Sequence, residues 1–401
     1  MTYYRVPRAM PYWNGATYRA VLHSIASRGV VDGPAIGALR SLLIERLNVK
    51  DAMLCGTGRL ALEIAVRACG IGPGDEVILP DFCCSAIVSP ILAVGALPVL
   101  ADAGAELNVT AETIDAAMTQ KTRVIIVPHL FGNPAEIGAI VELARGKNVY
   151  VIDDAAQALG ATIDGRRAGS FGDLGIVSFG AEKVCFGLGG GAVVSQSQNF
   201  LNEHMRVDLS LPSLSSALRN LAATLVRRRW RRWTLPLLES FSCEDFQDPE
   251  APLGSYPRER LASLNAAVAR ALLQSLCENI AARHVRVRAY RDLLSSEQSL
   301  ELIPHRSGSA CLTQVVRVRK SRRSDDSAVA VINSLCKAGY EVQGSYVPIH
   351  RLSHCSMCAW DNLSYAERVW PDLIELPCEP DVTVEQVEQI ATIVKATASR
   401  K

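Results

Sequence analysis

The chain has almost no net charge, because 42 Lys and Arg residues are balanced by 41 Asp and Glu residues. With a pI near 7.5, it has no overall field that attracts nucleic acid or an anionic membrane. The composition also shows no sign of disorder, since 49% of the residues are hydrophobic and 21% are charged. We therefore expect a globular protein that does not bind nucleic acid and whose charged sites are local.

An uninterrupted apolar span is missing as well. Residues 82–101 carry no charge over a length that suffices to cross a bilayer, but Pro90, Gly95 and Pro98 interrupt them. We expect a buried helix, a turn and a strand there. The first 20 residues mix Tyr, Arg and Pro and lack an apolar signal core. The sequence therefore predicts a cytoplasmic protein.

Disulfide bonds are not needed in a chain of 401 residues, which can bury a large core. The 12 cysteines are scattered, and several lie in apolar runs. We expect free thiols that act as small core residues in a reducing compartment.

Helical and strand patterns alternate from Gly56 to about Ser195. A helical stretch begins near Leu60, and short runs rich in Val and Ile follow at residues 77–79, 97–100, 124–127, 149–152 and 176–179. Strands buried on both faces in this rhythm predict an α/β domain with a large, mostly parallel sheet. In such sheets ligands bind beyond the carboxyl ends of the strands.

The pattern changes near residue 199, where leucines at helical spacing lead into a run of Arg and Trp from Arg227 to Trp233. Long helical patterns, a strand at residues 315–318 and a helix capped by Thr383 follow, which predicts a smaller α+β domain. We expect a large domain of residues 1–255, with a helical Arg/Trp-rich insertion at about 205–250, and a small domain of residues 256–401.

Segments near the predicted strand ends carry residue types that suit one cofactor. Thr57 and Gly58 open a helix whose free N–H groups and dipole favour an anion. Asp154 follows a buried strand and can pair with a protonated ring nitrogen, with Gln157 on the same helical face. Lys183 follows the next predicted strand, where desolvation can free its amine for a Schiff base.

Each of these segments also has a simpler explanation: a capped helix start, a solvated acid or a surface lysine. The residues 187–191, Gly-Leu-Gly-Gly-Gly, indicate a turn that allows close backbone packing behind the lysine. Together, in this order and in one domain, the segments match a pyridine ring that carries a phosphate and an aldehyde.

Longer phrases distributed over about residues 33–396 carry a resemblance to a known family. They are Gly56-Thr57, Gly72-Pro-Gly-Asp-Glu-Val-Ile, Gly95-Ala-Leu-Pro-Val, His129-Leu-Phe-Gly, Asp154-Ala-Ala-Gln157-Ala, Gly169-Ser-Phe-Gly-Asp173, Ser178-Phe, Lys183, Arg260-Leu-Ala-Ser-Leu-Asn-Ala-Ala-Val and Pro348-Ile-His350. With them the chain resembles the DegT/DnrJ/EryC1/StrS family of sugar aminotransferases, which depend on pyridoxal phosphate (PLP).

The resemblance implies a fold-type-I PLP enzyme that acts as a homodimer with shared active sites. It implies transfer of an amino group from an amino acid, with glutamate as the expected donor, to a keto group of a nucleotide-linked or otherwise activated sugar in glycan or secondary-metabolite biosynthesis. By this resemblance, Lys183 forms the Schiff base and transfers protons. Asp154 pairs with the ring nitrogen, and Gln157 contacts the ring near its hydroxyl. The phosphate is held by Thr57, Gly58 and Ser178, and His350 faces the substrate. His129 is expected to be structural.

The chain departs from the family pattern at several positions. Cys84 stands where many members stack an aromatic residue on the ring, so either Cys84 or Phe82 must cover it. Arg258 replaces an Asn that reaches the phosphate of the partner, and its charge suits the same anion. Val184 and Leu188 also differ from the family residues, and these changes concern the substrate more than the cofactor.

Two further patterns have more than one interpretation. The run from Arg227 to Trp233 fits a solvated or dimer-facing helix best, ahead of a site for a nucleotide-sugar pyrophosphate and of a helix on a membrane surface. The residues His350, His354, Cys355 and Cys358 have the spacing of metal ligands, but only one Cys-x-x-Cys pair is present. We expect no metal.

Other activities within the same fold stay open. Relatives dehydrate sugars or aminate cyclitols and other ketones that carry no nucleotide, and a PLP fold without catalysis can act as a regulator. Dehydrating relatives replace the lysine by His, so Lys183 favours transamination.

Overall fold

The computed structural model describes residues 4–8, 10–198, 208–230, 255–319 and 327–399, and only the backbone of Arg229, Trp230 and Ser327. Its larger sheet has seven strands in the order β1-β9-β8-β5-β4-β2-β3. These strands are β1 (Asp51–Cys55), β2 (Glu76–Pro80), β3 (Leu97–Ala101), β4 (Thr122–Pro128), β5 (Tyr150–Asp154), β8 (Leu174–Ser178) and β9 (Gly191–Ser195).

The strands β8, β5, β4, β2 and β3 are mutually parallel, whereas β9 runs antiparallel to its neighbours β8 and β1. The prediction of a mostly parallel sheet is therefore confirmed. Because β1 has the same direction as β5 and β8, the carboxyl ends of these three strands lie at one edge of the sheet.

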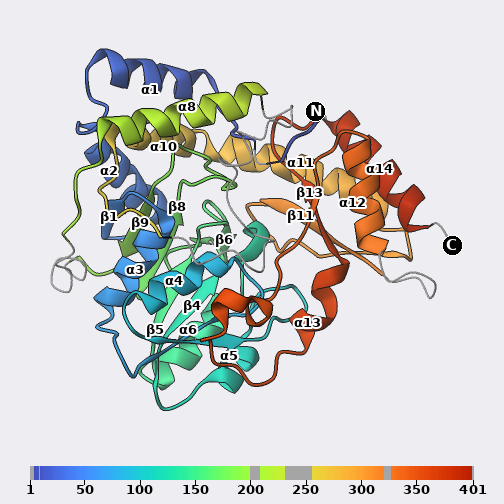
Figure 1. The fold of residues 1–401 in the computed structure, drawn as a ribbon, viewed down its shortest axis with the longest axis horizontal. Coiled ribbons are helices and arrows are strands. Elements are labelled where there is room, and N and C mark those ends of the chain that lie inside the picture. The colour runs from blue at the N-terminus through green and yellow to red at the C-terminus, as the bar shows by residue number, and fades with distance from the viewer. Residues whose placement is uncertain (1–3, 9, 199–207, 231–254, 320–326, 400–401) are drawn as a thin grey trace.

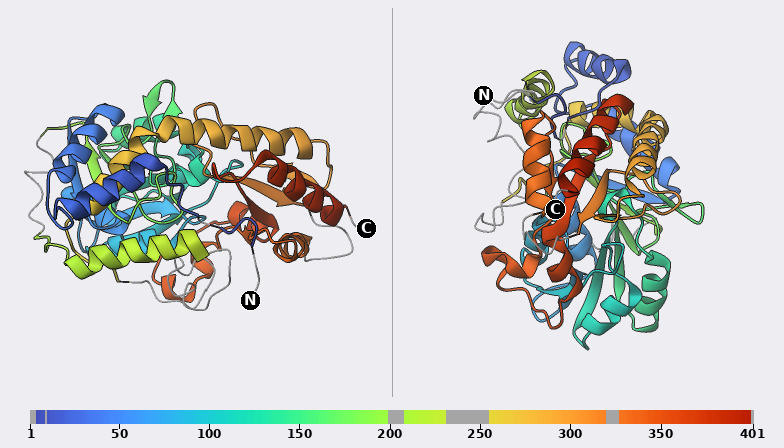
Figure 2. Two further views of the ribbon diagram at one scale, coloured as in Figure 1. Left: turned by 90° about the horizontal axis from the view of Figure 1, so that it is seen from above. Right: turned by 90° about the vertical axis from the view of Figure 1, so that its right-hand side faces the viewer.

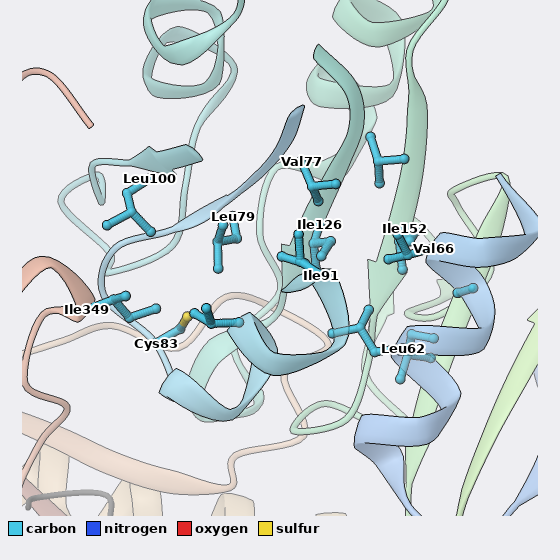
Figure 3. Packing of buried hydrophobic residues seen from close by; sticks show 14 of the residues in the cluster. Leu62, Val66, Val77, Leu79, Cys83, Ile91, Leu100, Ile126, Ile152 and Ile349 are labelled. Atoms are coloured by element: carbon cyan, nitrogen blue, oxygen red, sulfur yellow. The ribbon is translucent and has the colours of Figure 1, made fainter. Parts of the chain in front are cut away.

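Helices cover both faces of this sheet, as expected for strands that are apolar on both sides. On one face α3 (Gly58–Ala68) and α4 (Val88–Leu92) pack through Leu62, Val66 and Ile91 against Val77 and Ile152 (Figure 3). On the other face α5 (Ala111–Ala117) and α6 (Ile137–Gly146) contact the alternate side chains of the same strands. The two cores hold the strand ends, and thus the site, in place.

A second group of helices lies at the β1 end of the sheet. It comprises α1 (Gly15–Ala26), α2 (Ala35–Leu47), α8 (Leu214–Trp230) and α10 (Ser263–Gln274), and α1 and α8 run side by side in two views (Figures 1 and 2). Leu39 and Leu43 of α2, Leu264 of α10 and Leu221 of α8 share one apolar cluster with Val194 of β9.

The small domain contains a four-stranded sheet in the order β10-β11-β13-β12. Its elements are β10 (Leu300–Leu302), β11 (Thr313–Val318), β12 (Gln343–Gly344) and β13 (Leu373–Pro377), with α11 (Leu276–Leu294), α12 (Ser327–Lys337), α13 (Tyr365–Val369) and α14 (Val384–Ala398). The helix α11 runs from α10 to this sheet (Figure 1). The N-terminal segment joins the same domain, since Val6 forms a β-bridge with Tyr340.

The domain limits at residues 255 and 256 stay a prediction. The helix α10, which follows the predicted boundary, packs on α1 and α2 of the large domain. The predicted insertion at about 205–250 falls partly outside the described residues, which include α8 but not residues 231–254.

Local predictions are confirmed where short-range signals are strong. Residues 82–101 form a 3₁₀ turn (Ser85–Ile87), α4 and β3, as expected. Thr383 and Gln386 form a reciprocal capping box at the start of α14. None of the helices in the described part of the chain is long and apolar enough to cross a membrane.

Candidate active site

A cavity of about 250 Å³ opens at the carboxyl edge of the large sheet. All seven residues predicted to contact the cofactor line it: Thr57, Gly58, Cys84, Asp154, Gln157, Ser178 and Lys183. They come from the ends of β1, β2, β5 and β8 and from the segments that follow these strands, which are distant in sequence. The fold therefore gathers the predicted set in one place.

The start of α3 forms a corner of this cavity whose N–H groups and helix dipole suit an anion. The Thr57 side chain accepts a hydrogen bond from the Leu60 N–H at 3.1 Å, so its hydroxyl proton stays available for a ligand. A Cβ added to Gly58 would lie 2.8 Å from the Ser178 Oγ, and one added to Gly191 would lie 2.7 Å from the Thr57 carbonyl. Only glycine leaves this corner open. The glycine-rich turn thus packs closely against Thr57. It also packs against Phe179, whose carbonyl accepts hydrogen bonds from the Gly187 and Gly189 N–H groups.

Two adjacent aspartates at the end of β5 have different surroundings. Asp153 is fully buried and accepts hydrogen bonds from His129 at 2.7 Å and from the Gly169 and Phe171 N–H groups at 2.8 Å. Asp154 lines the cavity and accepts a hydrogen bond from the Ala156 N–H at 2.9 Å. Asp153 is therefore structural, and Asp154 is the carboxylate that a bound ring can reach.

Burial raises the pKa of Asp154, whereas the Ala156 N–H and the positive charge of Lys183 lower it. A protonated ring nitrogen beside Asp154 would supply the positive charge that a buried carboxylate needs. The corner at Gly58 and this carboxylate both fit pyridoxal phosphate, one at its phosphate and the other at its ring.

His129 is held by both ring nitrogens, as expected of a structural residue. Its Nδ1 accepts a hydrogen bond from the Ala135 N–H at 2.9 Å, and its Nε2 is 2.7 Å from the Asp153 carboxylate. This pattern corresponds to the neutral tautomer that carries its proton on Nε2. His129 therefore orients the buried Asp153 carboxylate.

Lys183 follows β8 on a segment that is anchored from two sides. The preceding residue, Glu182, has a left-handed backbone (φ 60°) and forms an ion pair with Arg8 at 2.7 Å. The following residue, Val184, accepts a hydrogen bond through its carbonyl from Asn279 of α11 at 3.1 Å. These contacts hold the lysine at the wall of the cavity.

A smaller cavity of about 70 Å³ lies on the other side of Lys183 and Gln157. Tyr346 lines it, and its hydroxyl accepts a hydrogen bond from the Gln157 Nε2 at 3.0 Å. The ring of Tyr346 stacks on Phe131 with centroids 5.7 Å apart. Sequence reasoning missed Tyr346, although it stands two residues before the Pro348-Ile-His350 phrase.

Cys84 and Phe82, the two residues expected to cover the ring, differ in burial and position. Phe82 is fully buried and packs edge-on against Tyr346 at 5.9 Å, so it belongs to the core. Cys84 is half-buried and lines the cavity. Of the two residues only Cys84 lines the cavity, and its contact with a bound ring stays a prediction.

Arg258 and His350 lie outside both cavities. Arg258 forms an ion pair with Glu63 at 2.8 Å and is about half exposed. His350 contacts Asp81 through Nδ1 at 2.8 Å and Glu367 through Nε2 at 3.3 Å. Within one chain neither side chain is turned to the site, and their substrate roles stay predictions.

The possible metal set does not come together in the described part of the chain, where no group of three or more His, Cys, Asp or Glu side chains is arranged to hold a metal. Cys355 and Cys358 are buried, and the Cys358 N–H donates to the Cys355 carbonyl at 3.0 Å in a tight turn.

Solved structures place this fold in a known class. The chain is similar to the Escherichia coli GDP-4-keto-6-deoxy-D-mannose-3-dehydratase, which was solved with bound hydrated PLP. The likeness covers 98% of this chain and 100% of that chain, with a TM-score of 0.80 and 18% sequence identity. This likeness shows the fold, which is that of the fold-type-I, PLP-dependent enzymes.

Sequence comparisons give the family. The signature described as the DegT/DnrJ/EryC1/StrS aminotransferase family matches residues 14–395, and the chain belongs to this family. It is 30% identical to the GDP-perosamine synthase of Caulobacter vibrioides, over 86% of this chain and 84% of that protein. It is 41% identical to the UDP-N-acetyl-3-dehydro-alpha-D-glucosamine 3-aminotransferase of Acidithiobacillus ferrooxidans, over 40% of this chain and 43% of that protein.

Proposed function

We propose that this enzyme transfers an amino group from glutamate to a ketone of a nucleotide-linked or otherwise activated sugar. The observation that carries the proposal is the single cavity that brings the start of α3, Asp154, Gln157 and Lys183 together. The names of the relatives from Caulobacter and Acidithiobacillus, both of which refer to nucleotide sugars, support this class of substrate.

Each residue of the cavity has a task that follows from its position. Pyridoxal phosphate supplies an electrophilic aldehyde carbon and a ring that accepts electrons. Thr57, Gly58 and Ser178 hold the phosphate with hydroxyl and N–H donors, assisted by the dipole of α3. Asp154 keeps a proton on the ring nitrogen, and Gln157 is held by Phe131 and Tyr346 so that its amide faces the ring.

Lys183 performs the covalent and the proton-transfer work. Its Nζ would hold the cofactor at the aldehyde carbon, with loss of water, until the amine of a substrate displaces it. The freed amine would then accept the proton that leaves the α-carbon of the donor and deliver one to the cofactor, and addition of water would release the donor as its keto acid. With the keto-sugar the same amine moves protons in the opposite direction, and the amino group ends on the sugar.

One competing activity, dehydration, differs from this one at Lys183. A dehydratase shares the fold, but dehydrating relatives were expected to carry His at this position, and this chain has Lys. A cyclitol or another ketone without a nucleotide is the second candidate acceptor. A purely regulatory role leaves the set of Lys183, Asp154, Gln157 and Ser178 in one cavity without a purpose.

We further propose a cytoplasmic homodimer in which each chain completes the site of the other. Arg258 is about half exposed and is held beside α3 by its ion pair with Glu63. We expect this arginine to reach the phosphate in the partner's site. The described cysteines are all free thiols, which suits a reducing compartment.

A spectroscopic experiment tests the proposed function. The purified protein should show a visible cofactor band, and borohydride followed by peptide mapping should label Lys183. Glutamate should bleach the band, and a keto-sugar nucleotide should restore it. Labelling of another lysine, or bleaching that no keto-sugar reverses, would contradict the proposal.

A further inference from the structure

Large apolar side chains gather on the outer surface of α1 and α8. Half of the exposed large hydrophobic side chains in the described part of the chain belong to α1, to α8 or to the residues just before α8. They are Tyr18, Leu22, Ile25, Leu211, Leu214, Leu218 and Leu225, and we call them the apolar surface. The two helices run side by side along the outside of the large domain (Figures 1 and 2). Single exposed apolar residues are common, but a group of this size on adjacent helices marks a contact surface.

Each of these two helices is apolar on two sides. In α1, Val21 is buried in the cluster that α1 shares with α2 and α10, whereas Leu22 and Ile25 have 67% and 47% of their surfaces exposed. In α8, Leu221 is buried in the same cluster, whereas Leu218, on a neighbouring face of the helix, is exposed. A helix on a globular domain needs one apolar stripe, which faces the core. The second stripe is not needed to hold either helix to the described residues.

Positive charge borders the apolar surface. Arg19 and Arg219 directly follow Tyr18 and Leu218, and both arginines are exposed. Arg28, two residues beyond the end of α1, is exposed as well. Neither α1 nor α8 contains an acidic residue. The two helices therefore present apolar side chains together with cations, and they contribute no anion.

A side chain of α8 joins the two helices and fixes this arrangement. Arg228 donates hydrogen bonds to the Tyr18 hydroxyl at 2.7 Å and to the Pro11 carbonyl at 2.6 Å. Its guanidinium also lies 5.9 Å from the centre of the Tyr18 ring. Because both helices pack on the same buried cluster, the apolar surface is already formed before any contact is made.

The charge of this surface decides between two occupants. A second copy of the chain would place the same surface against itself around a twofold axis. Arginines would then face arginines with no carboxylate from either helix between them, and such like-charge contacts disfavour association. An anionic lipid bilayer offers the opposite charge at its headgroups and an apolar layer just below them. Helices that lie on a membrane combine the same two features, with leucines on one face and arginines beside them.

We propose that α1 and α8 hold the enzyme on the surface of an anionic membrane. The apolar surface enters the boundary between headgroups and acyl chains, and Arg19 and Arg219 contact the lipid phosphates. The two helices lie in the plane of the interface. This inference goes beyond the proposed function, because it concerns where the enzyme works and does not depend on its substrate. Residues 231–233, which end the run of Arg and Trp, lie outside the described part of the chain and are not part of this surface.

Sedimentation with lipid vesicles tests the inference on the holoenzyme. Vesicles of phosphatidylcholine with about one third phosphatidylglycerol should bind the wild type roughly tenfold more tightly than vesicles of phosphatidylcholine alone. Added salt should weaken binding to the anionic vesicles, because it screens exposed charges.

The apolar contribution is tested by Leu22→Ser combined with Leu214→Ser, which should lower vesicle binding about tenfold or more. Val285→Ser combined with Val329→Ser is the matched control, because these valines are exposed on α11 and α12 of the small domain. The control should bind vesicles as the wild type does. Both double variants should keep the cofactor band of the wild type, since none of the four residues lines the cofactor cavity.

The charge contribution is tested separately by Arg219→Glu. This variant should bind anionic vesicles about tenfold more weakly and should bind neutral vesicles as the wild type does. Arg145→Glu is its control, because Arg145 is exposed on α6 and not on either of the two helices. The control should retain wild-type binding.

Failure of the wild type to bind either kind of vesicle would overturn the inference, and so would equal binding by the leucine variant and the wild type. An equal loss of binding in Arg219→Glu and Arg145→Glu would show that net charge, and not this surface, attracts the enzyme. Light scattering covers the other occupant. If the leucine variant alone changed its oligomeric state, the surface would belong to a contact between two copies, and the inference would be wrong.

Discussion

Asp153 and Asp154 are neighbours in sequence, yet the fold gives them unrelated tasks. They alternate across the end of β5, so one carboxylate points into a network of protein donors and the other toward the cavity. Single substitutions should therefore have opposite consequences for stability and activity.

Asp154→Asn should lower the rate of amino transfer by about 100-fold or more, because a neutral amide does not hold the ring proton as an ion pair. Its free energy of unfolding should change little. Asp153→Asn should instead cost roughly 2 to 4 kcal/mol of stability, since an amide cannot satisfy His129 and two N–H groups at once. Steady-state kinetics and denaturant unfolding of both variants check this contrast. Equal effects on both quantities would contradict it.

Glu375 predicts a pH dependence of stability. Burial raises its pKa to about 7, although the charge of Arg8 and the Ser345 hydroxyl oppose the shift, and Glu182 adds to it. Between pH 4.5 and 7 the unfolded chain ionises this carboxyl while the folded chain retains the proton. The free energy of unfolding should then fall as pH rises through that window.

Glu375→Gln should remove this contribution, so that the variant gains stability over the wild type between pH 5 and pH 8. Thermal unfolding at closely spaced pH values measures the difference. A constant difference across the range would show that Glu375 does not titrate there.

At the scale of elements, the start of α3 illustrates how backbone and side chains share one task. Gly58→Ala places a Cβ 2.8 Å from the Ser178 Oγ, so the phosphate corner must open. Cofactor affinity should fall roughly tenfold, which fluorescence titration of the apoprotein with PLP measures.

Gly138→Ala is the matched control, because Gly138 is exposed on α6 and an added Cβ meets no atom within 4 Å. This change should raise stability by about 0.5 to 1 kcal/mol and leave cofactor affinity unchanged. If both variants lost cofactor equally, the corner would not depend on Gly58.

At the scale of the whole molecule, the proposed dimer predicts that activity depends on residues from both chains. If Arg258 serves the partner's phosphate, the Lys183→Ala and Arg258→Glu proteins should each be nearly inactive. Their mixed dimer combines an intact Lys183 from one chain with an intact Arg258 from the other. After exchange of subunits, about a quarter of all sites should be complete.

Activity measured before and after mixing the two variants checks this expectation, with each variant mixed with itself as the control. No recovery in an exchanged mixture would place Arg258 in its own chain's site, or outside any site.

The amino-acid sequence by itself predicted much of the fold and the cofactor of this protein. The parallel strands, the capped helix α14 and the helix, turn and strand within residues 82–101 depend on short-range patterns, and all are confirmed. The cofactor also followed from the sequence, because Thr57, Asp154 and Lys183 stand at strand ends, and parallel strands bring such ends to one edge.

Only the tertiary structure decided which side chains face the cavity. It separated Asp154 from Asp153 and Cys84 from Phe82, added Tyr346, and turned His350 toward Asp81. The physical reason is that the sequence sets the period and polarity of each element, whereas the direction of a side chain depends on what packs against it from distant parts of the chain.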